Sequence, residues 1–210
     1  MKIIDIQPLA INNIKVVRFA RFCDHRGYFT EHYRKSDFES HLGFKKDMIF
    51  VQTNESYSKK GTIRGLHFQW NPYMGKLVRT ITGRMIDLVL DIRIGSPSFG
   101  KIILHDMPAG HKENYQDWIW VPPGFAHGNI FPEDTIIEYF CTGEYNSGCE
   151  AGISPLASDI DWTWCDNNLK QVFENLSAST ALITEKDKNG FSIEGWKSDK
   201  RSENFIYGQL

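Results

Sequence analysis

A strand-like stretch, residues 61–69, holds the side chains best suited to chemistry in this sequence. Arg64, His67 and Gln69 stand there among apolar neighbours, and Lys76 follows shortly after them. Residues at i and i+2 share one face of a strand, so His67 and Gln69 point the same way. An imidazole beside an amide in the hollow of a β-barrel would suit ligand chemistry. A hydrogen-bonded core histidine explains the stretch equally well when it is taken alone.

The spacing of Arg64 and His67 makes a geometric prediction. A regular strand places Ile63, Gly65 and His67 on one face and Arg64 on the other, because side chains alternate with a period of two. If Arg64 and His67 both enter one site, a β-bulge or kink must occur near Gly65.

The residues allow acid–base catalysis. His67 can act as a base near neutral pH if a carboxylate fixes its tautomer, and Tyr139 could donate a proton from across a cavity. Lys76, Arg64 and Arg26 could supply positive charge for an oxyanion or for phosphates. A core tyrosine, and solvated charges at Lys76 and Arg26, are the alternative interpretations.

The sequence gives little support for a metal or a redox cofactor. Gln69, not a second histidine, stands two residues after His67. His127, in the turn 122–128, adds only one further candidate ligand, and a tight metal site needs several ligands. No P-loop, dinucleotide-binding glycine motif or nucleophile elbow occurs. We therefore predict a site with neither metal nor cofactor.

Composition indicates an ordinary globular enzyme or binding protein. The 210 residues are 41% hydrophobic and 24% charged, and the net charge of −2 gives no reason to expect nucleic acid or an anionic membrane as partner. No apolar run approaches the length of a membrane span. The four cysteines form no CxxC pair and no secretory segment opens the chain, which predicts reduced thiols in the cytoplasm.

Alternating patterns predict an all-β fold in one domain over 1–210. Residues 48–139 give strand after strand with Gly, Pro and Asn between them, which favours a sandwich or barrel. Residues 85–93 alternate most clearly, with an aliphatic face and a mixed face. A capping-box pattern at Ser36 and Glu39 predicts a short helix over 36–41. Apolar spacing predicts another over 167–176, and 188–210 is expected to be a surface extension docked through its aromatic rings.

These motifs, taken together and in order, resemble the dTDP-4-dehydrorhamnose 3,5-epimerase family. The match runs from residues 22–31 to about residue 162 and resumes at 185–187, and its specific parts are residues 64–69, 75–79, 91–100 and 123–128. The resemblance implies a cupin-type jelly roll (a double-stranded β-helix) with a few short peripheral helices. It also implies homodimers that exchange N-terminal strands, in which the aliphatic face of 86–92 is a candidate for packing.

The resemblance implies a role for each matching residue. His67 corresponds to the base, Asp187 to its carboxylate partner, Tyr139 to the acid and Lys76 to the group that holds the ketone oxygen. The spacer before Asp187 is longer than usual, which leaves Asp159, Asp161 and Asp166 as alternatives. The positions implied to bind nucleotide, diphosphate or sugar are Arg26, Phe29, Glu31, Gln52, Asn54, Arg64, His127, Tyr145, Glu150 and Lys186.

The predicted function is metal-free inversion of C3 and C5 in a nucleotide-linked 4-keto-6-deoxy sugar, for surface-polysaccharide synthesis. His67 would take a proton next to the carbonyl, and Tyr139 would return one to the opposite face. One enzyme alternative inverts a single centre or acts on a CDP- or GDP-linked sugar. An alternative from a different class is a cupin that binds a sugar nucleotide without catalysis.

Overall fold

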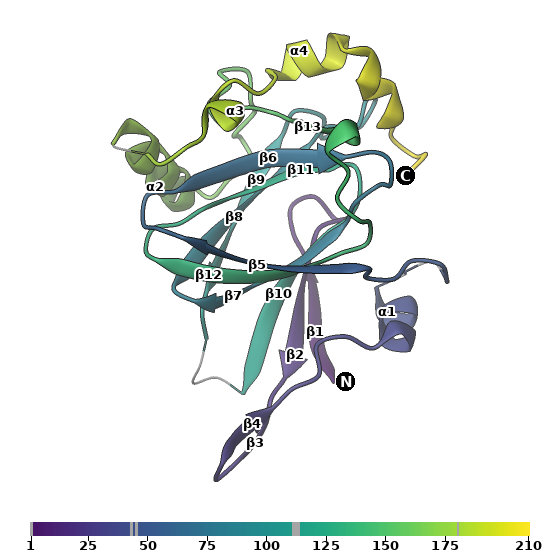
Figure 1. The fold of residues 1–210 in the computed structure, drawn as a ribbon, viewed down its shortest axis with the longest axis vertical. Helices are drawn as coiled ribbons and strands as arrows, with labels where there is room; N and C mark the ends of the chain where they lie inside the picture. Colours follow the sequence, from purple (N-terminus) through teal and green to yellow (C-terminus); the bar gives the residue numbers. More distant parts are fainter. Residues whose placement is uncertain (1, 43, 45, 111–113, 180) are drawn as a thin grey trace.

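Two antiparallel sheets face each other and make up most of the protein (Figure 1). The computed structural model describes residues 2–42, 44, 46–110, 114–179 and 181–210. The six-stranded sheet contains, in spatial order, β1 (Ile3–Pro8), β2 (Lys15–Ala20), β10 (Tyr115–Val121), β7 (Lys76–Thr82), β12 (Thr135–Cys141) and β5 (Gln52–Ser58). The five-stranded sheet contains β13 (Glu150–Gly152), β6 (Ile63–Gln69), β11 (Phe125–Ile130), β8 (Arg84–Asp91) and β9 (Ile102–Pro108). The arrangement is the predicted cupin-type jelly roll.

Strand β8 shows how the sequence pattern becomes a core. Met85 and Val89 point into the space between the sheets, where they join the apolar cluster that holds the two layers together. Ile86, Leu88 and Leu90 point out of the other face of the five-stranded sheet. From Met85 onward both faces of β8 are buried, and that part of the strand is apolar except for Asp87 and Asp91.

Short helices from the C-terminal third cover that outer face. They are α2 (Asn167–Ala178), α3 (Glu185–Lys188), α4 (Ile193–Ser198) and the 3₁₀ helix η2 (Lys200–Asn204). Trp196 and Phe205 are fully buried against the sheet, whereas Tyr207 stays exposed. The aliphatic face of β8 is therefore covered by its own chain, so the idea that it packs against a second copy is wrong.

Both predicted helices form, but the predicted start is right for only one of them. Helix α2 begins after Asp166, whose carboxylate accepts hydrogen bonds from the first turn, as the spacing indicates. Helix α1 (Lys35–His41) instead begins after Arg34, with no side-chain cap. Ser36 lies inside the helix, so the predicted capping box is wrong. Among the described residues, no helix is both long and apolar enough to cross a bilayer.

Strand β6 contains the predicted bulge. Its register against β11 shifts, because His127 pairs with His67 while Asn129 pairs with Arg64. Ile63 consequently joins Leu66 in the outer core, and both Arg64 and His67 face the space between the sheets. Gly65 has φ of +104°. A Cβ there would lie 2.7 Å from Gly128 Cα, so only glycine fits this crossing of β6 and β11.

His32 lies in a third apolar cluster, between α1 and the outer face of the six-stranded sheet. Its ring packs 4.9 Å from that of Trp118, measured between centroids. Burial, with help from the positive charges of Arg79 and Arg21, lowers the pKa of His32 to about 4. The folded protein thus keeps this imidazole neutral where an unfolded chain would protonate it.

We expect His32 to make the protein sensitive to mild acid. Below about pH 6.5 the unfolded state takes up a proton that the folded state refuses until about pH 4, so stability falls as the pH falls through this window. Between pH 7 and pH 5 the loss is about 1–2 kcal/mol. Urea unfolding of His32→Phe should show a flatter acid limb. The control His41→Asn, at an exposed histidine, should keep the wild-type slope.

Candidate active site

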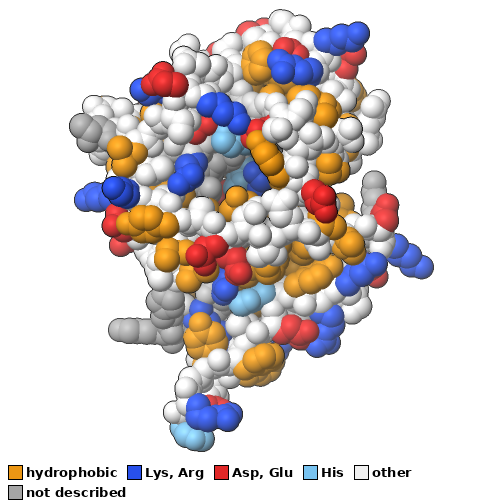
Figure 2. All heavy atoms as spheres, viewed as in Figure 1, with side chains coloured by type: hydrophobic (Ala, Val, Ile, Leu, Met, Phe, Trp, Pro, Cys, Tyr) orange, Lys and Arg blue, Asp and Glu red, His pale blue; other side chains and the backbone are white. Residues whose placement is uncertain are grey.

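A central hollow opens between the two sheets and is visible on the face shown in Figure 2. It has two lobes of about 380 and 390 Å³. His67, Lys76, His127 and Tyr139 line both lobes. The residues predicted as base, acid and oxyanion group therefore line one cavity.

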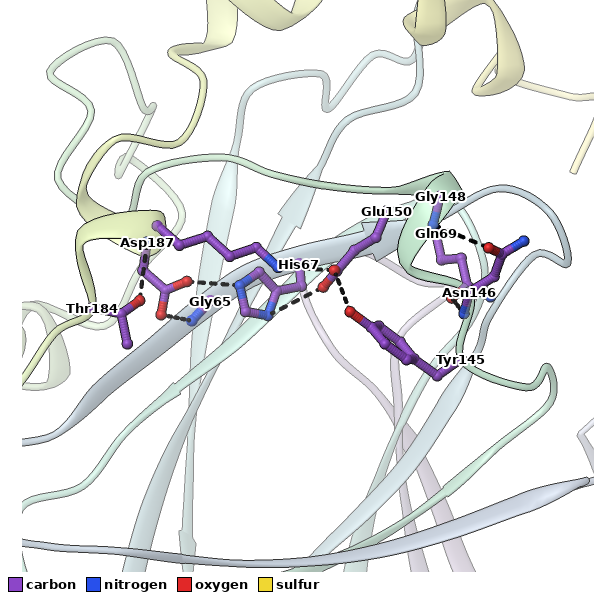
Figure 3. Close-up of polar contacts among 10 residues, drawn as sticks. Gly65, His67, Gln69, Tyr145, Asn146, Gly148, Glu150, Thr184 and Asp187 are labelled. Carbon is purple, nitrogen blue, oxygen red and sulfur yellow. Dashed lines mark hydrogen bonds and ion pairs between the residues drawn. The ribbon is translucent and has the colours of Figure 1, made fainter.

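His67 and Asp187 form a close pair at the wall of the hollow (Figure 3). His67 Nε2 lies 2.7 Å from Asp187 Oδ1, and the other carboxylate oxygen accepts a hydrogen bond from the Gly65 backbone N–H at 3.3 Å. Helix α3 presents Asp187 because Thr184 caps it and accepts from the Asp187 N–H. Burial acts to raise the pKa of Asp187, but the hydrogen bond from His67 holds it below the ordinary value. The carboxylate stays ionised and fixes the proton of His67 on Nε2.

The three alternative carboxylates serve other purposes. Asp166 caps α2, and Asp161 is ion-paired with Lys101. Asp159 accepts hydrogen bonds from the first backbone N–H groups of α4. Only Asp187 among the four candidates contacts His67.

Lys76 projects from β7 into the hollow. Among the described residues, none forms a hydrogen bond or ion pair with its ammonium group. Burial lowers the pKa of Lys76, although Cys141, Glu150 and Asp87 act in the opposite direction. An ammonium group that faces a cavity in this way suits an oxygen that becomes negative during a reaction.

Tyr139 lies across the hollow from His67. It belongs to β12 of the six-stranded sheet, whereas His67 belongs to β6 of the five-stranded sheet. Its neighbour across the strand pair is Asn54 on β5. Burial raises the pKa of Tyr139, so its phenol keeps a proton that it can donate.

Glu150 stands on the side of His67 opposite to Asp187 (Figure 3). Its Oε1 lies 4.0 Å from His67 Nδ1, and its Oε2 accepts hydrogen bonds from Tyr145 at 3.0 Å and from Lys186 at 2.8 Å. Although burial acts to raise it, the hydrogen bonds from Lys186 and Tyr145 hold the pKa of Glu150 below its ordinary value.

Four more of the predicted binding residues line the hollow. Gln52 and Asn54 lie on β5, with a hydrogen bond of 3.1 Å between their side chains. Arg64 reaches one lobe and donates to Ser58 Oγ at 2.8 Å. His127 is held by the buried Asp87, 2.8 Å away.

Comparison with known proteins decides the family. The family model described as dTDP-4-dehydrorhamnose 3,5-epimerase matches residues 8–195. The chain belongs to this family. It is 41% identical over 192 residues to the dTDP-4-dehydrorhamnose 3,5-epimerase of Sinorhizobium fredii, covering 89% of this chain and 88% of that one. The predictions of family and of an isomerase are confirmed.

Solved structures of the family have the same fold. The 3,5-epimerase from Legionella pneumophila in complex with dTDP-4-keto-L-rhamnose matches with a TM-score of 0.80 and 28% identity, covering 98% of this chain and 99% of that chain. A 3′-monoepimerase from Streptomyces bikiniensis in complex with dTDP-quinovose matches with a TM-score of 0.74 and 25% identity, covering 91% of this chain and 89% of that chain.

Three predicted binding residues lie away from the hollow. Arg26 and Phe29 belong to the hairpin of β3 (Phe22–Asp24) and β4 (Gly27–Phe29), which projects from the body of the protein (Figure 1), and Glu31 follows it. Arg26 is ion-paired with Asp24, and Phe29 is 67% exposed. The fold does not bring these residues to the site of their own chain.

Sequence reasoning missed several residues of the hollow, and strand alternation could have found some of them. Cys141 follows Tyr139 by two residues on β12, and Ser56 follows Asn54 by two on β5. The missed lining residues are Glu55, Ser56, Met74, Val78, Val121, Phe125, Cys141, Asn129, Ile137, Leu182 and Thr184.

In the part of the chain that the structure describes, no three His, Cys, Asp or Glu residues cluster as metal ligands. The expectation of a metal-free site stays a prediction.

Proposed function

We propose that this protein inverts both C3 and C5 of a dTDP-linked 4-keto-6-deoxy sugar through enolate intermediates. The observation that carries the proposal is the arrangement of the His67–Asp187 pair on one sheet and Tyr139 on the other, with Lys76 in the hollow between them. A protein that only binds a sugar nucleotide has no need of a base and an acid on facing walls.

His67 is the base in this mechanism. Because Asp187 holds the proton on Nε2, the lone pair of the neutral ring is on Nδ1. The C3 and C5 protons of the sugar are acidic because each adjoins the C4 carbonyl. Removal of one by Nδ1 gives an enolate and an imidazolium, and Asp187 stabilises the positive charge. A positioned base contributes about 10²–10⁴-fold to the rate.

Lys76 and Tyr139 complete each inversion. The Lys76 ammonium stabilises the enolate oxygen, a contribution of about 3–4 kcal/mol for a preorganised donor. Tyr139 then donates its phenolic proton to the carbon from the face opposite His67. Because removal and return occur on opposite faces, the centre is inverted.

The nucleotide end supplies binding energy remote from the reacting carbons. Arg64, Gln52, Asn54, His127, Tyr145, Glu150 and Lys186 are proposed to bind the sugar, diphosphate and nucleoside. We propose dTDP as the nucleotide because the relatives bound to sugar nucleotides contain it. The four cysteines are free thiols, which supports work in the reducing cytoplasm.

We also propose that the protein works as a homodimer in which the β3–β4 hairpin reaches the partner's site. Phe22, Tyr28 and Phe29 are 51%, 48% and 67% exposed on this projecting hairpin. Strand β1 pairs with β2, and β2 pairs with β10 of its own chain, so we propose the hairpin as the N-terminal segment that is exchanged. Arg26, Phe29 and Glu31 would then bind nucleotide in the other copy. Sedimentation should give twice the chain mass of 24.2 kDa.

Exchange in heavy water tests the reaction. Incubation with dTDP-4-keto-6-deoxyglucose in D₂O should place deuterium at both C3 and C5 of the product, as read by NMR. Deuterium at one centre alone would instead indicate a monoepimerase. A complete lack of exchange, with binding retained in calorimetry, would indicate a non-catalytic binding protein.

A further inference from the structure

A second hollow reaches His67 from outside the site. This outer hollow, of about 240 Å³, lies at the edge of the five-stranded sheet and is lined by Gly152, Ile153, Asn189, Phe191 and Arg201, together with the residues around His67. His67 lines the outer hollow and both lobes of the central hollow. The imidazole therefore stands in the wall between two cavities.

A base that inverts two centres must lose the first proton before it can remove the second. This inference rests on the function proposed above. The first abstraction leaves a proton on His67 Nδ1, and the second cannot start until that proton has left. Asp187 is poorly placed to carry it away, because Nε2 already donates to this carboxylate, which is 6% exposed. A sugar in the central hollow also shields Nδ1 from water on that side.

Glu150 is the group placed to take this proton. Its Oε1 is 4.0 Å from Nδ1, so a shift of about 1 Å forms a hydrogen bond. Its side chain lines both the central and the outer hollow. The residues that hold its other oxygen, Tyr145 and Lys186, are themselves exposed to solvent.

We propose that Glu150 is the proton relay that resets His67 between the two inversions. Nδ1 of the imidazolium gives its proton to Glu150 Oε1, which leaves a neutral imidazole and a carboxylic acid. The carboxylic acid then gives the proton to water in the outer hollow and returns to a carboxylate. The Tyr139 phenolate takes a proton from water, so the enzyme gains and loses one proton per inversion.

The surroundings of Glu150 favour rapid release of the proton. The ionisable groups around it include His67, Tyr145, Lys186 and Asp187, together with Lys76 in the central hollow and Arg201 in the outer one. The hydrogen bond from Lys186 favours the ionised carboxylate, so the protonated form of Glu150 is short-lived and the relay returns to its starting state.

The substitution Glu150→Gln tests the relay because it keeps the size of the side chain and removes its basicity. In a single turnover with enzyme in excess, exchange at the first centre should proceed within about 3-fold of the wild-type rate. Steady-state turnover in dilute buffer should fall by about 10- to 100-fold, which is less than the about 10²–10⁴-fold of a base that acts on the substrate itself. The singly inverted sugar should accumulate, and added imidazole buffer should restore turnover.

The control is Glu185→Gln, which removes an exposed, ion-paired glutamate of α3. It should show neither accumulation nor buffer dependence. Glu150→Asp, which keeps a carboxylate one methylene further back, should slow turnover less than glutamine and respond less to buffer. It also gives the readout if the glutamine variant unfolds.

The outcomes separate the relay from the proposed function. A raised KM with no response to buffer would leave Glu150 with its proposed substrate-binding role alone and overturn the relay. Equal slowing of both centres in a single turnover would overturn it too. Absence of exchange in the wild-type protein would instead refute the epimerase function itself.

Discussion

Replacing His67 by asparagine is expected to lower deuterium exchange at both centres by about 10³–10⁴-fold, because the base that starts each inversion is lost. The thermal midpoint should change little, since the His67 side chain is 30% exposed in the wall of a cavity and not in the core. NMR of the sugar in D₂O measures the first effect and calorimetry the second. Loss of folding in this variant would return His67 to a structural role.

Asp187→Asn provides the matched test of the pair. The amide can donate to Nε2, which moves the ring proton to Nδ1 and removes the lone pair that acts as base. Exchange should fall about as far as in His67→Asn, and the double variant should be no slower than either single one, because the two residues act as a unit. Additive losses would show that they act separately.

Replacing Lys76 by methionine should lower kcat by about 10²–10³-fold and change KM little. The ketone is neutral in the ground state and becomes negative only in the enolate, so the ammonium acts mainly in the transition state. The thermal midpoint should stay or rise, because the variant removes a charge that burial disfavours. Steady-state kinetics and calorimetry measure these effects. Lys170→Met, at an ion-paired surface lysine of α2, is the control.

The pH dependence of turnover should differ between the wild type and Lys76→Met on the alkaline side. Burial lowers the pKa of Lys76 below 10.5, so turnover should fall as the pH rises through this lowered value and the ammonium loses its proton. Lys76→Met should lose this alkaline limb while keeping the acid limb. An unchanged alkaline limb in the variant would assign it to another group.

Much of the fold follows from local pattern. The alternation in β8 predicted its two faces because a pleated strand must point successive side chains to opposite sides. The odd spacing of Arg64 and His67 predicted the bulge near Gly65, on the condition that both side chains enter one site. By contrast, the start of α1 was misplaced because a capping-box pattern of Ser36 and Glu39 carries no information about packing, and the apolar cluster under α1 sets where this helix lies.

The limits of sequence reasoning at the site have a different cause. His67, Lys76 and Tyr139 were found from residue types, motif order and family resemblance. Their relation to Glu150 and the outer hollow depends on where β13 and α3 meet, which is a tertiary contact. The position of Arg26 on a projecting hairpin likewise cannot be deduced from a motif, since a matching residue does not say which copy of the chain it serves.

The long chain separation of His67 and Asp187 has a consequence for protein synthesis. A ribosome delivers the carboxylate 120 residues after the imidazole, so a nascent or prematurely terminated polypeptide carries a histidine without its orienting partner. The C-terminal segment that contains Asp187 also covers the outer face of the five-stranded sheet, where Trp196 and Phe205 are buried. Gentle warming that detaches this segment should therefore abolish turnover before the two sheets come apart, and cooling should restore it.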